Sequence, residues 1–224
     1  MLAVGVVKSK RENYGSELEA RIGRIENGVF QAGVLKSQWY AMLQSLTAYD
    51  GWCKTTEFHT RADMFFDKGV RLTKHFTSGD FVSEDVGEPS ITCIIKSKIK
   101  TADVRIGKTG FMCRVCCSGE TPVDFKPNQS PTFVRLKLLK SFTTMSGFRF
   151  DVSQVWSAKT FDEARAKSQS GIEPDFEVEI ELIDSNYLSK NTDTFVADSF
   201  LLKAKKLVEC IASSDQQAQA HGNA

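Results

Sequence analysis

Glu177-Val178-Glu179-Ile180-Glu181 lies near the C-terminal end of the chain, and a second acidic stretch, Glu17-Leu18-Glu19-Ala20-Arg21, lies near its beginning. Successive side chains of a β-strand point to opposite faces, so each stretch would present charged residues on one face and apolar residues on the other. Carboxylates two residues apart repel each other and contribute nothing to strand stability. The two stretches therefore predict two half-buried strands whose charged faces have a role other than folding.

A single acidic strand of this kind is most often the water-exposed face of an antiparallel sheet. Here there are two, separated by segments rich in lysine and arginine, which weakens that interpretation. A hard divalent cation such as Mg²⁺ or Mn²⁺ binds carboxylate oxygens and would remove their repulsion. The pattern favours a site for a compact, metal-bound anion.

The composition sets the size and class of the protein. The chain has 224 residues, 41% of them hydrophobic, and a formal net charge of +1. So small a net charge argues against a protein that coats long polyanions. No interdomain linker is apparent, so we expect one domain over residues 1–212. A disordered tail rich in Gln, Ala and Ser is expected at 213–224.

The six cysteines do not form a recognisable metal or disulfide pattern. Cys113 and Cys116 have CxxC spacing, but no second pair follows and the three histidines are scattered. We expect free thiols in a reducing compartment. No apolar run approaches the roughly 18 residues of a membrane span, and residues 1–7 lack the basic region of a signal peptide. The chain is expected to be soluble and intracellular.

Local patterns predict three helices and a series of short strands. The helices are expected at Lys36–Tyr49, at Thr160–Lys167 with Thr160 as N-cap, and at Thr194–Ala212. Strands are expected at Glu17–Arg24, Thr55–Arg61, Gly69–Phe76, Ile91–Ile99, Phe111–Cys117, Phe133–Phe142, Phe148–Trp156 and Phe176–Ile183. Many antiparallel strands with few helices predict a mainly β (α+β) fold, a closed barrel with flanking helices.

The middle strands alternate like the acidic ones, but their charged faces are mostly basic. The residues that share these faces are Arg71 and Thr73; Lys96 and Lys98; Arg114 and Glu120; Arg135 and Lys137; and Arg149, Asp151 and Ser153. If the charged faces point inward, an acidic wall lies opposite a basic wall. Buried charges need partners, and a metal–polyphosphate complex would pair with both walls.

In this order the strands resemble those of the triphosphate tunnel metalloenzymes, from about Glu17 to Ile183. The nearest branch is the metal-dependent mRNA 5′-triphosphatases of fungi, protozoa and large DNA viruses. Gly69-Val-Arg71-Leu-Thr73 resembles a phosphate-binding strand of that family, and Phe148-Arg149-Phe-Asp151-Val-Ser153 resembles its Arg-x-Asp-x-Thr/Ser strand. The resemblance implies a closed eight-stranded antiparallel tunnel. It also implies hydrolysis of the γ-phosphate of triphosphate-ended RNA, the first step of mRNA capping, with NTP hydrolysis as a possible side activity with manganese.

The stretch from Arg135 to Phe142 departs from the family pattern. It resembles a strand that reads Arg-x-Lys-Asp-Arg-x-Ser-Tyr in the family, and the second arginine of that pattern falls on Leu139. Two interpretations are open. Either Lys140 substitutes for the arginine through a local β-bulge, or one phosphate contact is missing.

The resemblance also implies roles for single residues. Glu17, Glu19 and Glu181 would bind Mg²⁺ or Mn²⁺, and Glu179 or Glu120 would orient the attacking water. Glu177, Asp151 and Ser153 would support the site. The basic side chains that would bind phosphate oxygens are Arg71, Lys96, Arg114, Arg135, Lys137 and Arg149. Of these, Arg71, Lys137 and Arg149 would also act in catalysis.

Two other functions remain as alternatives. The first is an inorganic tripolyphosphatase or thiamine-triphosphatase-like member of the same superfamily, which prefers Glu-x-Glu-x-Lys where this chain has Arg21. The second is a non-catalytic module that binds polyphosphate or nucleotides. No lysine motif of a guanylyltransferase is evident, so that activity is expected on a partner. Localisation is expected in the nucleus for a cellular protein, and in the cytoplasm or virion for a viral one.

Overall fold

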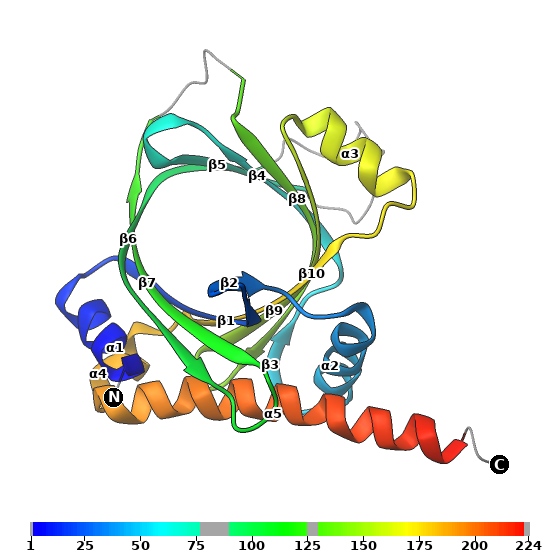
Figure 1. Cartoon of the computed structure of the whole chain (residues 1–224). Helices are drawn as coiled ribbons and strands as arrows, with labels where there is room; N and C mark the ends of the chain where they lie inside the picture. The colour runs from blue at the N-terminus through cyan, green and yellow to red at the C-terminus, as the bar shows by residue number, and fades with distance from the viewer. Residues whose placement is uncertain (1, 77–89, 125–129, 222–224) are drawn as a thin grey trace.

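Eight antiparallel strands close into a barrel in the computed structural model, which describes residues 2–76, 90–124 and 130–221, with side chains as far as Ile211. Around the barrel the order is β1, β7, β6, β5, β4, β8, β9 and β10, and β10 pairs with β1 to close the ring (Figure 1). The strands are β1 (Ser16–Glu26), β4 (His59–Phe65), β5 (Val70–His75), β6 (Ser90–Arg105), β7 (Met112–Pro122), β8 (Phe133–Thr144), β9 (Phe148–Ala158) and β10 (Asp175–Leu182). The predicted mainly β tunnel with flanking helices is confirmed.

Two short strands lie outside the ring order. β3 (Trp52–Thr55) pairs with β8, and β2 (Val29–Ala32) forms a hairpin with β1. The hairpin turns at Asn27 and Gly28, which have φ values of 50° and 77°. These positive angles suit the two-residue turns that match the twist of antiparallel strands. In the view down the barrel, β2 lies inside the ring (Figure 1).

The apolar faces of the strands point outward into two cores. Leu18, Ala20 and Ile22 of β1 belong to the larger core, under α1 (Leu2–Glu12), α2 (Lys36–Ala48), α4 (Ser185–Lys190) and α5 (Asp193–His221). α5 crosses the barrel along one side (Figure 1). The smaller core contains Leu136 of β8 and Ala164 of α3 (Phe161–Gln169). Because the helices cover the outer faces, the charged faces line the interior.

Several element boundaries differ from the sequence predictions. The predicted strand Thr55–Arg61 is wrong, because the chain there leaves β3 and enters β4 at His59. The helix α1, the helix α4 and the strand β2 were not predicted. The helix predicted at Thr194–Ala212 extends to His221, into the segment expected to be disordered, of which residues 222–224 lie outside the described part. The single domain over residues 1–212 stays a prediction.

The short charged helix was predicted correctly. Thr160 is the N-cap of α3, and its hydroxyl oxygen accepts a hydrogen bond from the Glu163 amide at 3.2 Å. The Glu163 carboxylate accepts one in return from the Thr160 amide, which completes a capping box. Within the described residues, no helix is long and apolar enough to cross a membrane.

Candidate active site

The predicted acidic wall is formed where β1 meets β10. Glu19 pairs directly across the strands with Glu181, and Glu17 lies two residues further along the same inward face of β1. Glu17 forms an ion pair with Lys96, and Arg21 lies 3.1 Å from Glu19. Arg149 donates a hydrogen bond of 2.5 Å to Glu181. The three predicted metal ligands therefore share one wall, and each carboxylate is turned toward a basic side chain.

The predicted basic residues of β5, β6, β8 and β9 also line the interior. Arg71 donates a hydrogen bond of 3.0 Å to Glu120, and Lys96 lies 3.5 Å from the same carboxylate. Arg135 lies 2.5 Å from Glu177, so the two side chains share the interior; the supporting role of Glu177 stays a prediction. With the exception of Arg114, the predicted phosphate-binding residues are in ion pairs with the predicted acidic residues.

Lys137 lies at the centre of this network. Its side chain is 3% exposed, and its Nζ lies 3.9 Å from carboxylate oxygens of Asp63, Glu177 and Glu179. Burial lowers the pKa of Lys137, and the negative charge of Glu179 opposes this shift. Burial alone would raise the pKa of Glu179, but Lys137 and Arg21 hold it below its ordinary value. Glu179 is therefore an ionised carboxylate deep in the tunnel.

Two interior residues of β4 were missed by sequence reasoning. Asp63 accepts hydrogen bonds from Thr73 at 2.9 Å and from Arg61 at 3.1 Å. Burial alone would raise the pKa of Asp63, but Arg61 and Lys137 together lower it. The signal was present in the alternation of Arg61 and Asp63 with the apolar Ala62 and Met64. It was lost because the strand was expected to end at Arg61.

The supporting residues of β9 lie where they were expected. Asp151 accepts a hydrogen bond of 2.6 Å from the Ser141 hydroxyl and two of 3.0 Å from Arg149. Ser153 is buried and lies directly across from Glu177. Arg149 is thus held between Asp151 and Glu181, with its guanidinium beside the acidic wall.

Arg114 differs from the other predicted phosphate ligands. Its guanidinium donates hydrogen bonds of 2.7 and 2.8 Å to Asp103 of β6, and it lies 4.2 Å above the ring of Phe30 in β2. Arg114 and Phe30 line one chamber of the tunnel together with Glu19, Arg21 and Lys96. Arg114 therefore belongs to the end of the tunnel that β2 partly fills.

The structure decides between the two interpretations of Leu139. Leu139 lines the interior beside Arg61 and Ser141, and it pairs with His59 across the strands. Lys140 lies on the other face of β8, with its Nζ 5.8 Å from the Phe58 ring centre and 5.6 Å from that of Phe142. The pairing of β8 with β9 continues through Leu139 and Lys140 without a register shift, and the pairing with β4 is regular as far as Leu139. Lys140 therefore does not replace a tunnel cation.

The acidic wall fits a hard divalent cation by the chemistry of its donors. Burial raises the pKa of Glu181 to about 7. Arg149 opposes this shift, and the nearby carboxylates of Glu17 and Asp151 add to it. Burial also raises the pKa of Glu19, with Glu179 adding to it. A cation would relieve this repulsion. Among the described residues no three His, Cys, Asp or Glu side chains stand together as a ready-made metal cluster, consistent with their pairing to basic neighbours.

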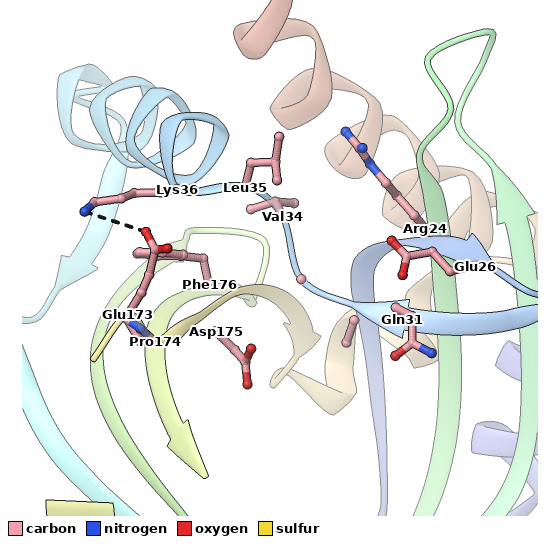
Figure 2. Close-up of a pocket in the computed structure, with 12 residues that line it drawn as sticks. Arg24, Glu26, Gln31, Val34, Leu35, Lys36, Glu173, Pro174, Asp175 and Phe176 are labelled. Atoms are coloured by element: carbon pink, nitrogen blue, oxygen red, sulfur yellow. Dashed lines mark ion pairs between the residues drawn. The ribbon is translucent and has the colours of Figure 1, made fainter. Parts of the chain in front are cut away.

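A further pocket lies outside this constellation, where the segment after β2 passes the start of β10 (Figure 2). Val34 bridges to Phe176, and Lys36 lies 3.7 Å from Glu173 across the pocket. Its volume is about 300 Å³, and its lining mixes acidic and basic side chains. None of the predicted site residues lines it, so the tunnel remains the candidate active site.

Comparison with known proteins bears on this tunnel. Residues 53–212 match the protein family described as "mRNA capping enzyme, beta chain", the mRNA triphosphatases. The chain belongs to this family. The match spans more than half of the chain and includes strands β4 to β10, so it covers both the basic wall and the second acidic strand. Membership makes the chain an RNA 5′-triphosphatase of a metal-dependent family.

Solved structures share the fold of this triphosphatase. The Pct1 RNA triphosphatase of S. pombe superposes with a TM-score of 0.62 at 15% identity, over 95% of this chain and 87% of that one. The mimivirus capping enzyme triphosphatase superposes with a TM-score of 0.59 at 13% identity, over 92% and 95%. Pct1 has also been solved in complex with the Spt5 CTD, and the mimivirus capping enzyme is described as trifunctional. No curated protein matches the chain significantly in sequence.

Proposed function

We propose that this triphosphatase removes the γ-phosphate of triphosphate-ended RNA inside the tunnel and leaves a diphosphate end. The observation that carries the proposal is the pairing of the two inward walls. Glu17, Glu19 and Glu181 form the acidic wall, and the cations of β5, β6, β8 and β9 surround the remaining space. A polyphosphate bound to a divalent cation complements both walls at once.

We assign Glu17, Glu19 and Glu181 as the residues that would hold Mg²⁺ or Mn²⁺. A bound divalent cation would supply charge stabilisation to a phosphoryl group that gains negative charge in the transition state. Lys96, Arg21 and Arg149 each pair with one of these three carboxylates. Each also contacts a second carboxylate, that of Glu120, Glu179 and Asp151 respectively. These second contacts would hold the three positive charges in place for phosphate oxygens.

The phosphate-binding wall consists of Arg71, Lys96, Lys137 and Arg149, with Arg135 behind them. Arg71 and Lys96 share Glu120, so this carboxylate holds two cations in a fixed position. Fixed cations stabilise the transition state because they need no reorganisation during the reaction. Arg114, which is paired with Asp103, would contribute only at the far end of the tunnel.

We propose that Glu179, and not Glu120, orients the attacking water. Its Oε1 is buried and makes no hydrogen bond within the part of the chain that the structure describes, although Arg21 lies 3.1 Å away. The lowered pKa of Glu179 keeps this oxygen a hydrogen-bond acceptor. Burial would raise that pKa, but Lys137 and Arg21 lower it by more. An ionised, unsatisfied carboxylate oxygen can accept a hydrogen bond from water.

The test is γ-phosphate release from triphosphate-ended RNA, ATP and tripolyphosphate, each with Mg²⁺, Mn²⁺ or chelator. We expect metal-dependent release from the RNA, with ATP and tripolyphosphate as competing substrates of the same tunnel. Glu179→Gln is expected to lower kcat by about 100-fold or more, with little change in KM. Metal-independent hydrolysis, or release from tripolyphosphate alone, would contradict the proposal. A partner that supplies guanylyltransferase activity is expected for the next capping step.

A further inference from the structure

The tunnel contains a second chamber, at the end where β3, β4, β5, β8 and β9 come together. Its volume is about 310 Å³. Among the described residues, five cationic or imidazole side chains line it, and Asp151 is the one carboxylate in this described lining. The five are Lys54, His59, Arg61, His75 and Arg149. The hydroxyl groups of Thr56, Ser141 and Thr143 complete the polar surface. This excess of donors and positive charge is suited to an anion.

Some of the positive charges and hydrogen-bond donors of this chamber are not paired with described residues. Asp151 is already engaged by Arg149 and Ser141, so it does not neutralise the remaining cations. Arg61 contacts Asp63 through one terminal nitrogen, but its buried Nε makes no hydrogen bond to any described residue. Arg61 and His75 pair directly across β4 and β5. Burial lowers the pKa of His75, and the positive charge of Arg61 adds to this effect. An unsatisfied guanidinium N–H is a donor that a phosphate oxygen can use.

Arg149 connects the chamber to the acidic wall. Arg149 lines it and also donates its hydrogen bond to Glu181, one of the proposed metal ligands. The other end of the tunnel is narrowed by β2, where Phe30 is buried beside Arg114 and β2 lies within the ring (Figure 1). A polymer whose triphosphate reaches the acidic wall would therefore extend through the basic chamber.

We infer that this chamber binds the phosphodiester groups of single-stranded RNA that follow the 5′-triphosphate. The inference rests on the proposed function and adds a source of preference for RNA over tripolyphosphate, which has no chain to place there. Phosphate contacts supply most of the sequence-independent affinity for nucleic acids. The described residues of the lining offer arginine, lysine and histidine donors but no phenylalanine, tyrosine or tryptophan ring for stacking, so the chamber would hold the chain by its backbone.

The experiment measures binding separately from hydrolysis. A fluorescently labelled 5′-hydroxyl RNA oligomer, which has no triphosphate, is titrated with metal-free protein and followed by anisotropy. The variants are Lys54→Gln and the double variant His59→Gln/His75→Gln. The matched control is Lys108→Gln, an exposed lysine in the turn between β6 and β7, at the opposite end of the tunnel.

We expect each chamber variant to raise the Kd by about 5-fold or more, because a hydrogen bond to a charged group is lost. Lys54→Gln should also reduce the slope of log K against log[salt] by about 0.7. Lys108→Gln should change the Kd by less than about 2-fold. The inference would be overturned if Lys108→Gln raised the Kd as much as the chamber variants do. It would also be overturned if a protein that hydrolyses triphosphate-ended RNA showed no measurable affinity for the oligomer.

The two proposals fail in different ways. If the protein binds the oligomer through the chamber but releases no γ-phosphate with any metal, the proposed function is wrong and the RNA site stands. If it releases γ-phosphate while the chamber variants bind RNA as wild type does, the inference is wrong and the function stands. Lys54 is exposed, so its variant decides the question even if the histidine variant does not fold.

Discussion

Replacing Lys137 by methionine removes the central charge of the tunnel while keeping most of the side-chain volume. Lys137 Nζ lies 3.9 Å from each of three carboxylates in an almost fully buried position. At this separation one such pair interacts by about 4 kcal/mol for an effective dielectric constant near 20, before desolvation is counted. Leaving buried carboxylates without their cation typically costs about 3–5 kcal/mol of stability. We expect destabilisation of that order.

The same change removes a fixed charge from the phosphoryl group. One preorganised contact is worth about 2–3 kcal/mol in the transition state, or about 30- to 150-fold in kcat/KM. The assay is steady-state γ-phosphate release from triphosphate-ended RNA with Mn²⁺, corrected for the folded fraction by circular dichroism. The double variant Lys137→Met/Glu177→Gln removes one cation and one carboxylate. It should recover part of the stability without recovering the activity.

Lys140→Met is the matched control, because Lys140 lies on the opposite face of the same strand. Its contacts with the Phe58 and Phe142 rings predict a loss of about 1 kcal/mol of stability at most, with kcat/KM unchanged. A Lys137→Met variant with near wild-type activity beside an impaired Lys140→Met variant would refute the reasoning. That result would mean that β8 presents its other face to the substrate.

Three further predictions follow from the site and the fold. Glu17→Ala and Glu19→Ala should each lower metal-dependent hydrolysis by more than about 10-fold; activity above a tenth of wild type at saturating metal removes that residue from the metal set. The folded pKa of Glu181 is raised to about 7 above its ordinary value of 4.5, chiefly by burial. Its contribution to stability is therefore lost as pH rises between those values. Urea unfolding of metal-free protein should show a fall of about 2 kcal/mol from pH 5 to 8, and Glu181→Gln should flatten it. Thr160→Ala should remove the α3 cap and cost about 1 kcal/mol with unchanged activity; an equal Tm for variant and wild type would show that the cap contributes nothing.

Much of the site could be predicted because side-chain alternation along a strand is local. The inward faces of β1, β5, β8, β9 and β10 follow from the sequence alone. The apolar residues that alternate with Glu19, Arg71 and Lys137 along their strands are buried, as the alternation predicts. Arg61 and Asp63 were missed because the end of a strand is less certain than its periodicity. The sequence also does not show that β4 pairs with β8, because the two strands lie far apart along the chain.

The sequence by itself determined the class of fold, the faces of the strands and the family to which the chain belongs. The tertiary structure decided which charges meet. The pairing of β10 with β1 places Glu181 beside Glu19, and the closure of the barrel brings Lys137 to three carboxylates from two different strands. It also turned Lys140 outward and placed β2 in one end of the tunnel. Alternation is fixed by neighbouring residues along the chain, whereas ion pairs across a barrel depend on strand order and register, which only the closed sheet specifies.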